Sequence, residues 1–395
     1  MSHCELRILQ TAYEQRRLQD IGTPKCELHF HKECTDETPS PDCTPHRSPD
    51  FCPLDKSFSF LIQQRTSSVL ADPAAASNAG YFFQDLEDKI KGYLFSANVA
   101  KVRTPKIYHC SSDIPSGIDD FTPTTEGFVI RATSLHSSHG IYVLPNGFDG
   151  IELLRRVTMT LDDVKTSLAI LEAKKIIIEE YIEGISGNGT LPIEYKIHVF
   201  NNQIGSINVV YNLGSNCACW AEVNEDWVRL DKWGCFTPTG TEMKDEGGQC
   251  HAIDFATGSG KAYPVKGLDI CGALERPDEC LIADITAVAK KVSKLIGAYV
   301  RIDMFVSKDN EIVVQEYTTN HMGGLRHCSA RIENGCINSC FLGEMWKAAG
   351  GDTTYGGPPT GIPDAIVKAN GLNDDALCEY AIASKQEPEY VPSCG

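Results

Sequence analysis

The chain has 395 residues, of which 42% are hydrophobic and 23% are charged, and its formal net charge is -17. This composition is typical of a globular protein that buries a sizeable core. The acidic balance argues against a general affinity for nucleic acid or anionic membranes, because such binding depends on clustered Lys and Arg. No apolar run is long enough to span a membrane, and the opening residues lack the apolar core of a signal peptide. We therefore expect neither nucleic acid nor a membrane as a partner.

Cysteine is unusually frequent, with 17 residues in the chain. The Pro-rich opening segment, which shows little hydrophobic periodicity, contains Cys4, Cys26, Cys34, Cys43 and Cys52. Such a segment has few residues for a core of its own and is typical of a disulfide-stapled module. We therefore expect disulfide bonds and an oxidising compartment, either the secretory-pathway lumen or the extracellular space. A cytoplasmic location is the alternative.

Within that segment, the stretch CELHFHKEC has two interpretations. Cys26, His29, His31 and Cys34 are the side-chain types that bind Zn²⁺, and the two histidines would share one face of a strand. A disulfide flanked by two ordinary histidines explains the same residues without a metal, and we prefer it.

Hydrophobic periodicity predicts regular helices and strands from about residue 82 onward. Helices are expected at 82–100, 161–173 and 281–296. Strands are expected at 104–110, 127–133, 141–144 and 174–184 and, as two hairpins, at 193–212 and 300–320. Residues 213–275 are irregular, and a Gly/Pro-rich tail follows residue 345. The pattern indicates a mixed α+β protein of two or three subdomains.

The second hairpin, VRIDMFVSKDNEIVVQEYTTN, places charge on what should be buried strands. Arg301 and Asp303 are two residues apart and share a face, and the returning strand brings Glu316 beside them. Two carboxylates next to a guanidinium could bind divalent cations together with the phosphates that those cations carry. An ordinary ion pair on the strand surface is the alternative for this hairpin taken alone.

Two further stretches carry related chemistry. Glu194 and Lys196 share a face of the first hairpin. Arg131 ends a strand that leads into the Ser/His/Gly turn at 134–140, and the backbone amides of such a turn can fold over phosphates. Each of these stretches alone is a weak indication of phosphate binding, and their order along the chain is the stronger signal.

The order of these elements over about residues 85–325 resembles the ATP-grasp superfamily, and within it the teichuronopeptide-biosynthesis (TupA-like) branch. The resemblance implies an α+β, ATP-grasp fold in which two α/β subdomains close on MgATP. It also implies the following division: 1–55, a cysteine-rich N-terminal segment; 56–125, an N-terminal subdomain; 126–190, the small nucleotide-lid subdomain; 191–345, the C-terminal subdomain with the metal site; and 346–395, a C-terminal tail.

The resemblance also implies roles for individual residues. It assigns phosphate contacts to Lys89, Arg131, Ser138, His139, Gly140 and Lys196, adenine contacts to Glu179, Glu180 and Ile182, and the ribose to Glu194. It assigns the metal to Asp303 and Glu316, with Thr318 or Asn320 completing the shell, the transferring phosphoryl group to Arg301, and the acceptor carboxylate to Arg326. Arg131 departs from the Lys of most members but keeps the charge, the loop after it has fewer glycines than usual, and Arg326 has the alternative of an ordinary surface residue.

The activity implied by the resemblance is an ATP-dependent carboxylate–amine ligase. Such an enzyme uses ATP with Mg²⁺ or Mn²⁺ to form an acyl phosphate, from which a small-molecule amine makes an amide while ADP and phosphate are released. Two alternatives remain at this stage: a kinase that phosphorylates a small-molecule or glycan hydroxyl, and a secreted binding protein without catalysis.

Overall fold

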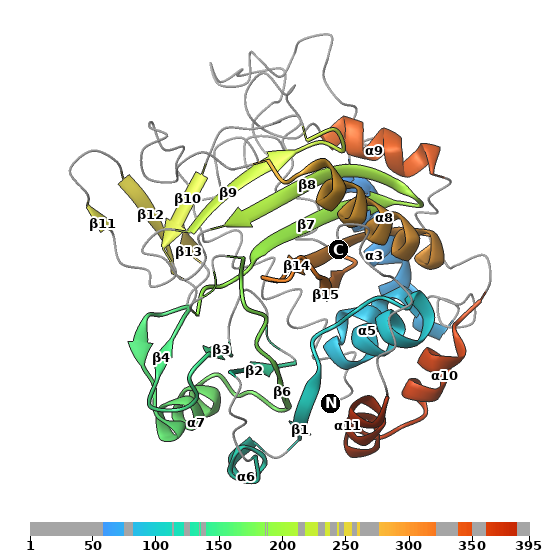
Figure 1. Cartoon of the computed structure of the whole chain (residues 1–395). Coiled ribbons are helices and arrows are strands. Elements are labelled where there is room, and N and C mark those ends of the chain that lie inside the picture. The colour runs from blue at the N-terminus through green and yellow to red at the C-terminus, as the bar shows by residue number, and fades with distance from the viewer. Residues whose placement is uncertain are drawn as a thin grey trace, which may run out of the picture.

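The computed structural model describes residues 58–74, 82–112, 114–121, 127–133, 135, 140–185, 187, 189–211, 218–227, 234–237, 243–244, 249–254, 259–260, 276–320, 339–349 and 361–384. The predicted cysteine-rich segment and the candidate residues Ser138, His139 and Arg326 lie outside these ranges. The described part mixes helices and sheets, as expected for an α+β protein (Figure 1). None of its helices has the length and apolar character needed to cross a membrane.

The larger sheet has the strand order β11-β12-β10-β9-β8-β7-β14-β15, with β13 paired to β12. Its members are β7 (Ile193–Phe200), β8 (Gln203–Tyr211), β9 (Ala218–Val223), β10 (Gly234–Thr237), β11 (Met243–Lys244), β12 (Gln249–Asp254), β13 (Ser259–Gly260), β14 (Tyr299–Val306) and β15 (Ile312–Thr318). Strands β9 to β13 come from the region that we predicted to be irregular, so that prediction missed the extension of the sheet.

Both predicted hairpins are confirmed. The β7–β8 turn holds Asn201 and Asn202 at positive φ angles of 40° and 74°, a backbone conformation that Asn tolerates and that matches strand twist in a two-residue turn. In the β14–β15 hairpin, Asp303 lies opposite Glu316 on one side and opposite Lys196 of β7 on the other. The register therefore brings together side chains that are far apart in the sequence.

The smaller sheet has the order β1-β6-β2-β3 and is antiparallel throughout. It consists of β1 (Ile107–Ser111), β2 (Phe128–Ala132), β3 (Ile141–Leu144) and β6 (Ile176–Glu180), while β4 (Ile151–Glu152) and β5 (Val157–Thr158) form a separate pair. Apolar residues of α6 (Ile114–Asp119) and α7 (Leu161–Ile170) pack against it. The predicted boundary at residues 125/126 runs through this sheet; the subdomain limits stay predictions.

Helices cover both faces of the larger sheet. Helix α8 (Glu279–Ile296) begins at its N-cap Asp278, ends at Gly297 with φ 70°, and packs its apolar side on Val300, Ile302 and Met304 of β14. Tyr299 alternates to the other face, where it packs with α3 (Phe58–Ala71) and with Trp346 of α9 (Ser339–Ala348). Because side chains alternate along a strand, Arg301 and Asp303 point to the same face as Tyr299.

The predicted helix at 82–100 forms as three consecutive segments beside β15: η3 (Phe82–Glu87), α5 (Lys89–Phe95) and the π-helical η4 (Ser96–Ala100). The carboxylate of Asp88 caps α5 by accepting from the amides of Ile90 and Lys91. This cap fixes where the helix starts, so that Lys89 occupies its first turn and is buried there.

The C-terminal region contributes α10 (Asp364–Asn370) and α11 (Asp374–Ala383), which we did not predict when we treated it as a surface tail. Both helices pack on α5, and α11 also contacts β1 (Figure 1). A disulfide joins Cys110 of β1 to Cys378 of α11. The C-terminal helices therefore fasten the smaller sheet to the helix that carries Lys89.

We expect the variant Cys110→Ser/Cys378→Ser to unfold more easily than the wild type, with a loss of about 2–4 kcal/mol, because the disulfide closes a very long loop. Denaturant unfolding under non-reducing conditions measures this loss. Mass spectrometry of non-reduced peptides should show the Cys110–Cys378 cross-link in the wild type. Equal unfolding free energies would contradict the expectation.

Candidate functional site

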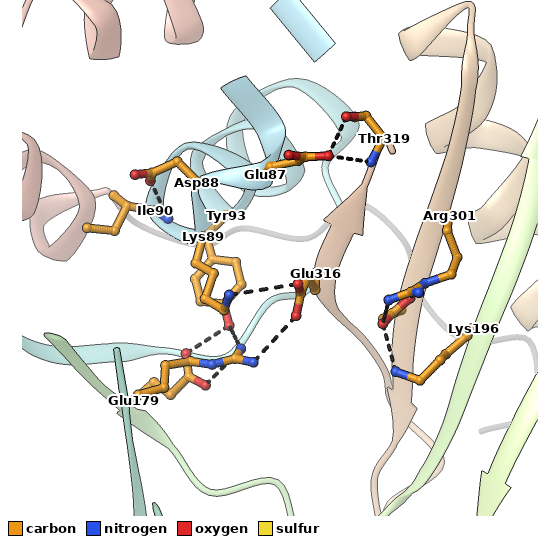
Figure 2. Close-up of polar contacts among 12 residues, drawn as sticks. Glu87, Asp88, Lys89, Ile90, Tyr93, Glu179, Lys196, Arg301, Glu316 and Thr319 are labelled. Carbon is orange, nitrogen blue, oxygen red and sulfur yellow. Dashed lines mark hydrogen bonds and ion pairs between the residues drawn. The ribbon is translucent and has the colours of Figure 1, made fainter. Parts of the chain in front are cut away.

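The candidate site lies where the smaller sheet and α5 meet the edge of the larger sheet (Figure 2). Arg131 comes from β2 and Glu179 from β6, Lys89 and Tyr93 come from α5, and Glu316 comes from β15. These side chains point toward one another from elements of both sheets. A charge-bearing cluster therefore occupies the contact between the two halves of the described structure.

Glu316 is at the centre of this contact. Its Oε1 lies 3.7 Å from Lys89 Nζ and its Oε2 lies 3.6 Å from Arg131 Nη2, both longer than a normal hydrogen bond. Burial opposes ionisation of Glu316, but Lys89 and Arg131 outweigh it and hold its pKa below the usual value. A quarter of the side chain remains exposed, so Glu316 is ionised and reachable from solvent.

Arg131, Tyr93 and Glu179 form the buried side of the cluster. Tyr93 donates to Glu179 Oε2 at 2.8 Å, while Arg131 Nη1 lies 3.3 Å from the Tyr93 hydroxyl and 3.4 Å from Glu179 Oε1. Burial raises the pKa of both Glu179 and Tyr93 and lowers that of Lys89. Gln315, with its amide oxygen turned inward, accepts from Arg131 at 3.2 and 2.9 Å.

Asp303 is the centre of a second, tighter group. Arg301 donates to both of its oxygens, Nε to Oδ1 at 2.6 Å and Nη2 to Oδ2 at 2.7 Å. Lys196 Nζ donates to Oδ2 at 2.8 Å and to Glu194 Oε1 at 2.6 Å. Burial disfavours the charged form of Asp303, but Arg301 and then Lys196 overcome this effect and hold its pKa at about 2.

The formal charges of the two groups together sum to zero. Four cations lie among four carboxylates: Lys89, Arg131, Lys196 and Arg301 with Glu179, Glu194, Asp303 and Glu316. Charges that have lost water need such partners, because an isolated buried ion is strongly unfavourable. The cluster can therefore accept an anion together with a cation without leaving a large uncompensated charge.

The residues fit a hard divalent cation. Asp303 and Glu316 are directly opposite each other on neighbouring strands, and both are carboxylates with lowered pKa. Asn320 Oδ1 is buried and accepts no hydrogen bond from the described residues. Over the same ranges, no three His, Cys, Asp or Glu side chains gather as a metal site. Mg²⁺ suits this set, since it is commonly bound by one or two carboxylates with water and phosphate oxygens.

The remaining candidate residues lie around this cluster or beyond the described ranges. The side chain of Glu180 accepts from Arg103 Nη2 at 2.7 Å and from the Lys106 amide at 3.1 Å, so it points away from the cluster members. Ile182 is buried just after β6, and Gly140 adopts φ 65° just before β3. Thr318 lies opposite Arg301. The ligand contacts assigned to these residues stay predictions.

Sequence reasoning missed Tyr93 and Gln315. Tyr93 follows Lys89 by four residues on α5, and this helical spacing places two side chains on one face. That signal was present in the sequence. Gln315 precedes Glu316, and nothing in the strand pattern distinguishes it, because its partner Arg131 comes from the other sheet.

No protein-family model matches the chain, and no curated protein matches it in sequence. Among solved structures, it is similar to D-alanine–D-alanine ligase from Helicobacter pylori (TM-score 0.32, 14% identity, 61% of this chain and 53% of that chain). It is also similar to a D-Ala:D-Ser ligase from Enterococcus faecalis (TM-score 0.38, 15% identity, 68% of this chain and 63% of that chain). A third similar structure is an ATP-grasp ligase complexed with a minimal precursor (TM-score 0.34, 11% identity, 70% of this chain and 62% of that chain).

The chain spans less than two thirds of the length of each of these three structures. With TM-scores this low, neither the fold family nor the reaction of this chain follows from the likeness.

The stability of the wild type should fall with decreasing pH partly through Asp303. Because its pKa is depressed in the folded state, its stabilisation is present above the unfolded pKa of about 4 and is lost as the pH falls toward 2. We expect Asp303→Asn to lower the free energy of unfolding by about 2 kcal/mol or more at pH 7, and this difference should shrink below pH 4. Urea unfolding at several pH values measures it, with Asp309→Asn in the exposed turn as control. A difference independent of pH would contradict the assignment.

Proposed function

We propose that this protein is an ATP-dependent carboxylate–amine ligase of the ATP-grasp type. The observation that supports the proposal is the convergence of four cations on two neighbouring carboxylates. Lys89 and Arg131 approach Glu316 from one side, and Lys196 and Arg301 approach Asp303 from the other. A triphosphate with its metal needs this combination of cationic side chains and hard oxygen ligands.

The contact lengths indicate how the nucleotide would enter. Lys89 and Arg131 attract Glu316 without hydrogen bonding to it. Phosphate oxygens could therefore accept hydrogen bonds from Lys89 and Arg131. A bound cation would then compensate the negative charge of Glu316 in their place. Mg²⁺, when bound, neutralises phosphate oxygens and polarises the terminal phosphoryl group. Asp303 and Glu316 would hold it, with Thr318 or Asn320 as the further ligand.

The described carboxylates of the cluster already have other partners or roles, which favours a carboxylate over a hydroxyl as phosphoryl acceptor. A hydroxyl has to lose its proton, and kinases commonly position an aspartate to accept it. Asp303 and Glu316 are assigned to the cation, and Asp303 already accepts hydrogen bonds from Arg301 and Lys196. The side chain of Glu179 is 4% exposed and is already paired with Tyr93 and Arg131. A substrate carboxylate is ionised at neutral pH and needs no base for this step.

The proposed reaction has two displacements. A carboxylate oxygen attacks the terminal phosphorus of ATP, the bond to ADP breaks, and an acyl phosphate forms. An amine then attacks the acyl carbon, phosphate leaves, and the amine nitrogen loses a proton to give the amide. In the first step Arg301 and Lys196 stabilise the negative charge of the phosphoryl group, and Arg131 with Lys89 orients it. We expect both substrates to be small molecules.

Incubation with MgATP, hydroxylamine and a pool of small carboxylates should give hydroxamate and ADP in equal amounts, because hydroxylamine traps an acyl phosphate. Colorimetric detection of hydroxamate together with coupled detection of ADP measures both products. Production must need ATP and an acid together. ADP without hydroxamate would favour the kinase alternative. The absence of both products would contradict the proposed reaction.

The variant Glu316→Gln should fold and lose MgATP turnover by at least about 100-fold, because an amide cannot replace a carboxylate beside the cation and the transferring phosphoryl group. Glu311→Gln, on the same hairpin but outside the cluster, is the matched control and should keep wild-type turnover. Unchanged turnover in Glu316→Gln would contradict the assignment of Glu316.

A further inference from the structure

The chain leaves β15 through a short segment that two charged side chains hold from opposite sides. Glu87 Oε1 accepts from the Thr319 amide at 3.0 Å, from Thr319 Oγ1 at 2.5 Å and from the Asn320 amide at 3.1 Å (Figure 2). Arg65 Nη2 donates to the Thr319 carbonyl. The peptide groups on both sides of Thr319 are therefore fixed in position.

Arg65 belongs to α3 and is 2% exposed. Its guanidinium lies 4.6 Å from the Trp346 ring centroid and 5.6 Å from that of Tyr299, and its Nη1 donates to the Tyr299 carbonyl at 3.3 Å. Tyr299 begins β14, and Thr319 directly follows the end of β15. Arg65 therefore bridges the two strands at the open end of the hairpin that carries Asp303 and Glu316.

Thr318 and Asn320, at the end of β15 and just beyond it, carry side-chain oxygens that could complete a metal shell with Glu316. Thr318 is two residues beyond Glu316 and shares its face of β15. Asn320 is two residues beyond Thr318, and its buried Oδ1 accepts no hydrogen bond within the described part of the chain. Glu87 also immediately precedes Asp88, the N-cap of α5. A single carboxylate thus ties the helix that carries Lys89 to the end of β15.

We propose that Glu87 and Arg65 are positioning residues for the metal-binding oxygens at the end of β15. This inference rests on the proposed function. Neither side chain touches the reactants; each acts through the backbone of Thr319 and Asn320. Residues that orient metal ligands in this way typically change metal affinity by 10–100-fold when they are removed.

Mn²⁺ binding to the full chain, with a non-hydrolysable ATP analogue present, tests the proposal without relying on turnover. Electron paramagnetic resonance counts free Mn²⁺ in a titration. We expect Glu87→Ala to weaken Mn²⁺ binding by about 10-fold or more. Glu87→Gln keeps an acceptor oxygen and should restore most of the affinity. Arg65→Lys keeps the charge but cannot reach both carbonyls, and it should weaken binding several-fold.

Glu152→Ala is the matched control. Glu152 is buried and, like Glu87, accepts from backbone amides, here those of Val143, Leu154 and Arg155, but it lies outside the cluster. It should lower thermal stability and leave Mn²⁺ affinity unchanged. Should Glu87→Ala fail to fold, Arg65→Lys decides the question.

Equal Mn²⁺ affinity in the wild type, Glu87→Ala and Arg65→Lys would overturn the inference and leave the proposed function standing. If the wild type itself bound no Mn²⁺ with the nucleotide analogue, the proposed function and the inference would both fall.

Discussion

The described structure depends on ionised side chains that have been removed from water at the junction of two sheets. Arg131 is almost completely buried, and its partners come from β6, α5 and β15. A buried guanidinium without partners would be strongly unfavourable, so the position of each of these elements depends on the others. If the proposed function holds, a nucleotide would take over the contacts of Lys89 and Arg131 to Glu316.

The two carboxylates of the β14–β15 hairpin have different environments although they lie opposite each other. Asp303 accepts short hydrogen bonds from Arg301 and Lys196, and all three residues belong to the larger sheet. Glu316 is more exposed and faces cations that belong to the other half of the molecule. The contacts of Asp303 therefore do not depend on the relative position of the two halves, whereas those of Glu316 do.

Sequence patterns predicted the hairpins and the helices α5, α7 and α8, because these depend on local periodicity, but they missed α3, α6, α9, α10 and α11. The shared face of Arg301 and Asp303, and the return of Glu316, follow directly from strand alternation. Patterns could not reveal which distant strands pair. The connection of β1 to β6 and the packing of α10 and α11 on α5 rest on contacts between residues more than 60 positions apart. The role of Glu87 depends on such a contact as well.

The position of β15 at the end of the larger sheet has a consequence for the protein in solution. An uncovered outer strand offers its amides and carbonyls to another molecule and favours aggregation. Here the Val314 amide donates to the Arg103 carbonyl at 2.8 Å, and the Thr319 and Asn320 amides are taken by Glu87. The strand that bears Glu316 is thereby closed to pairing with a second chain along these positions.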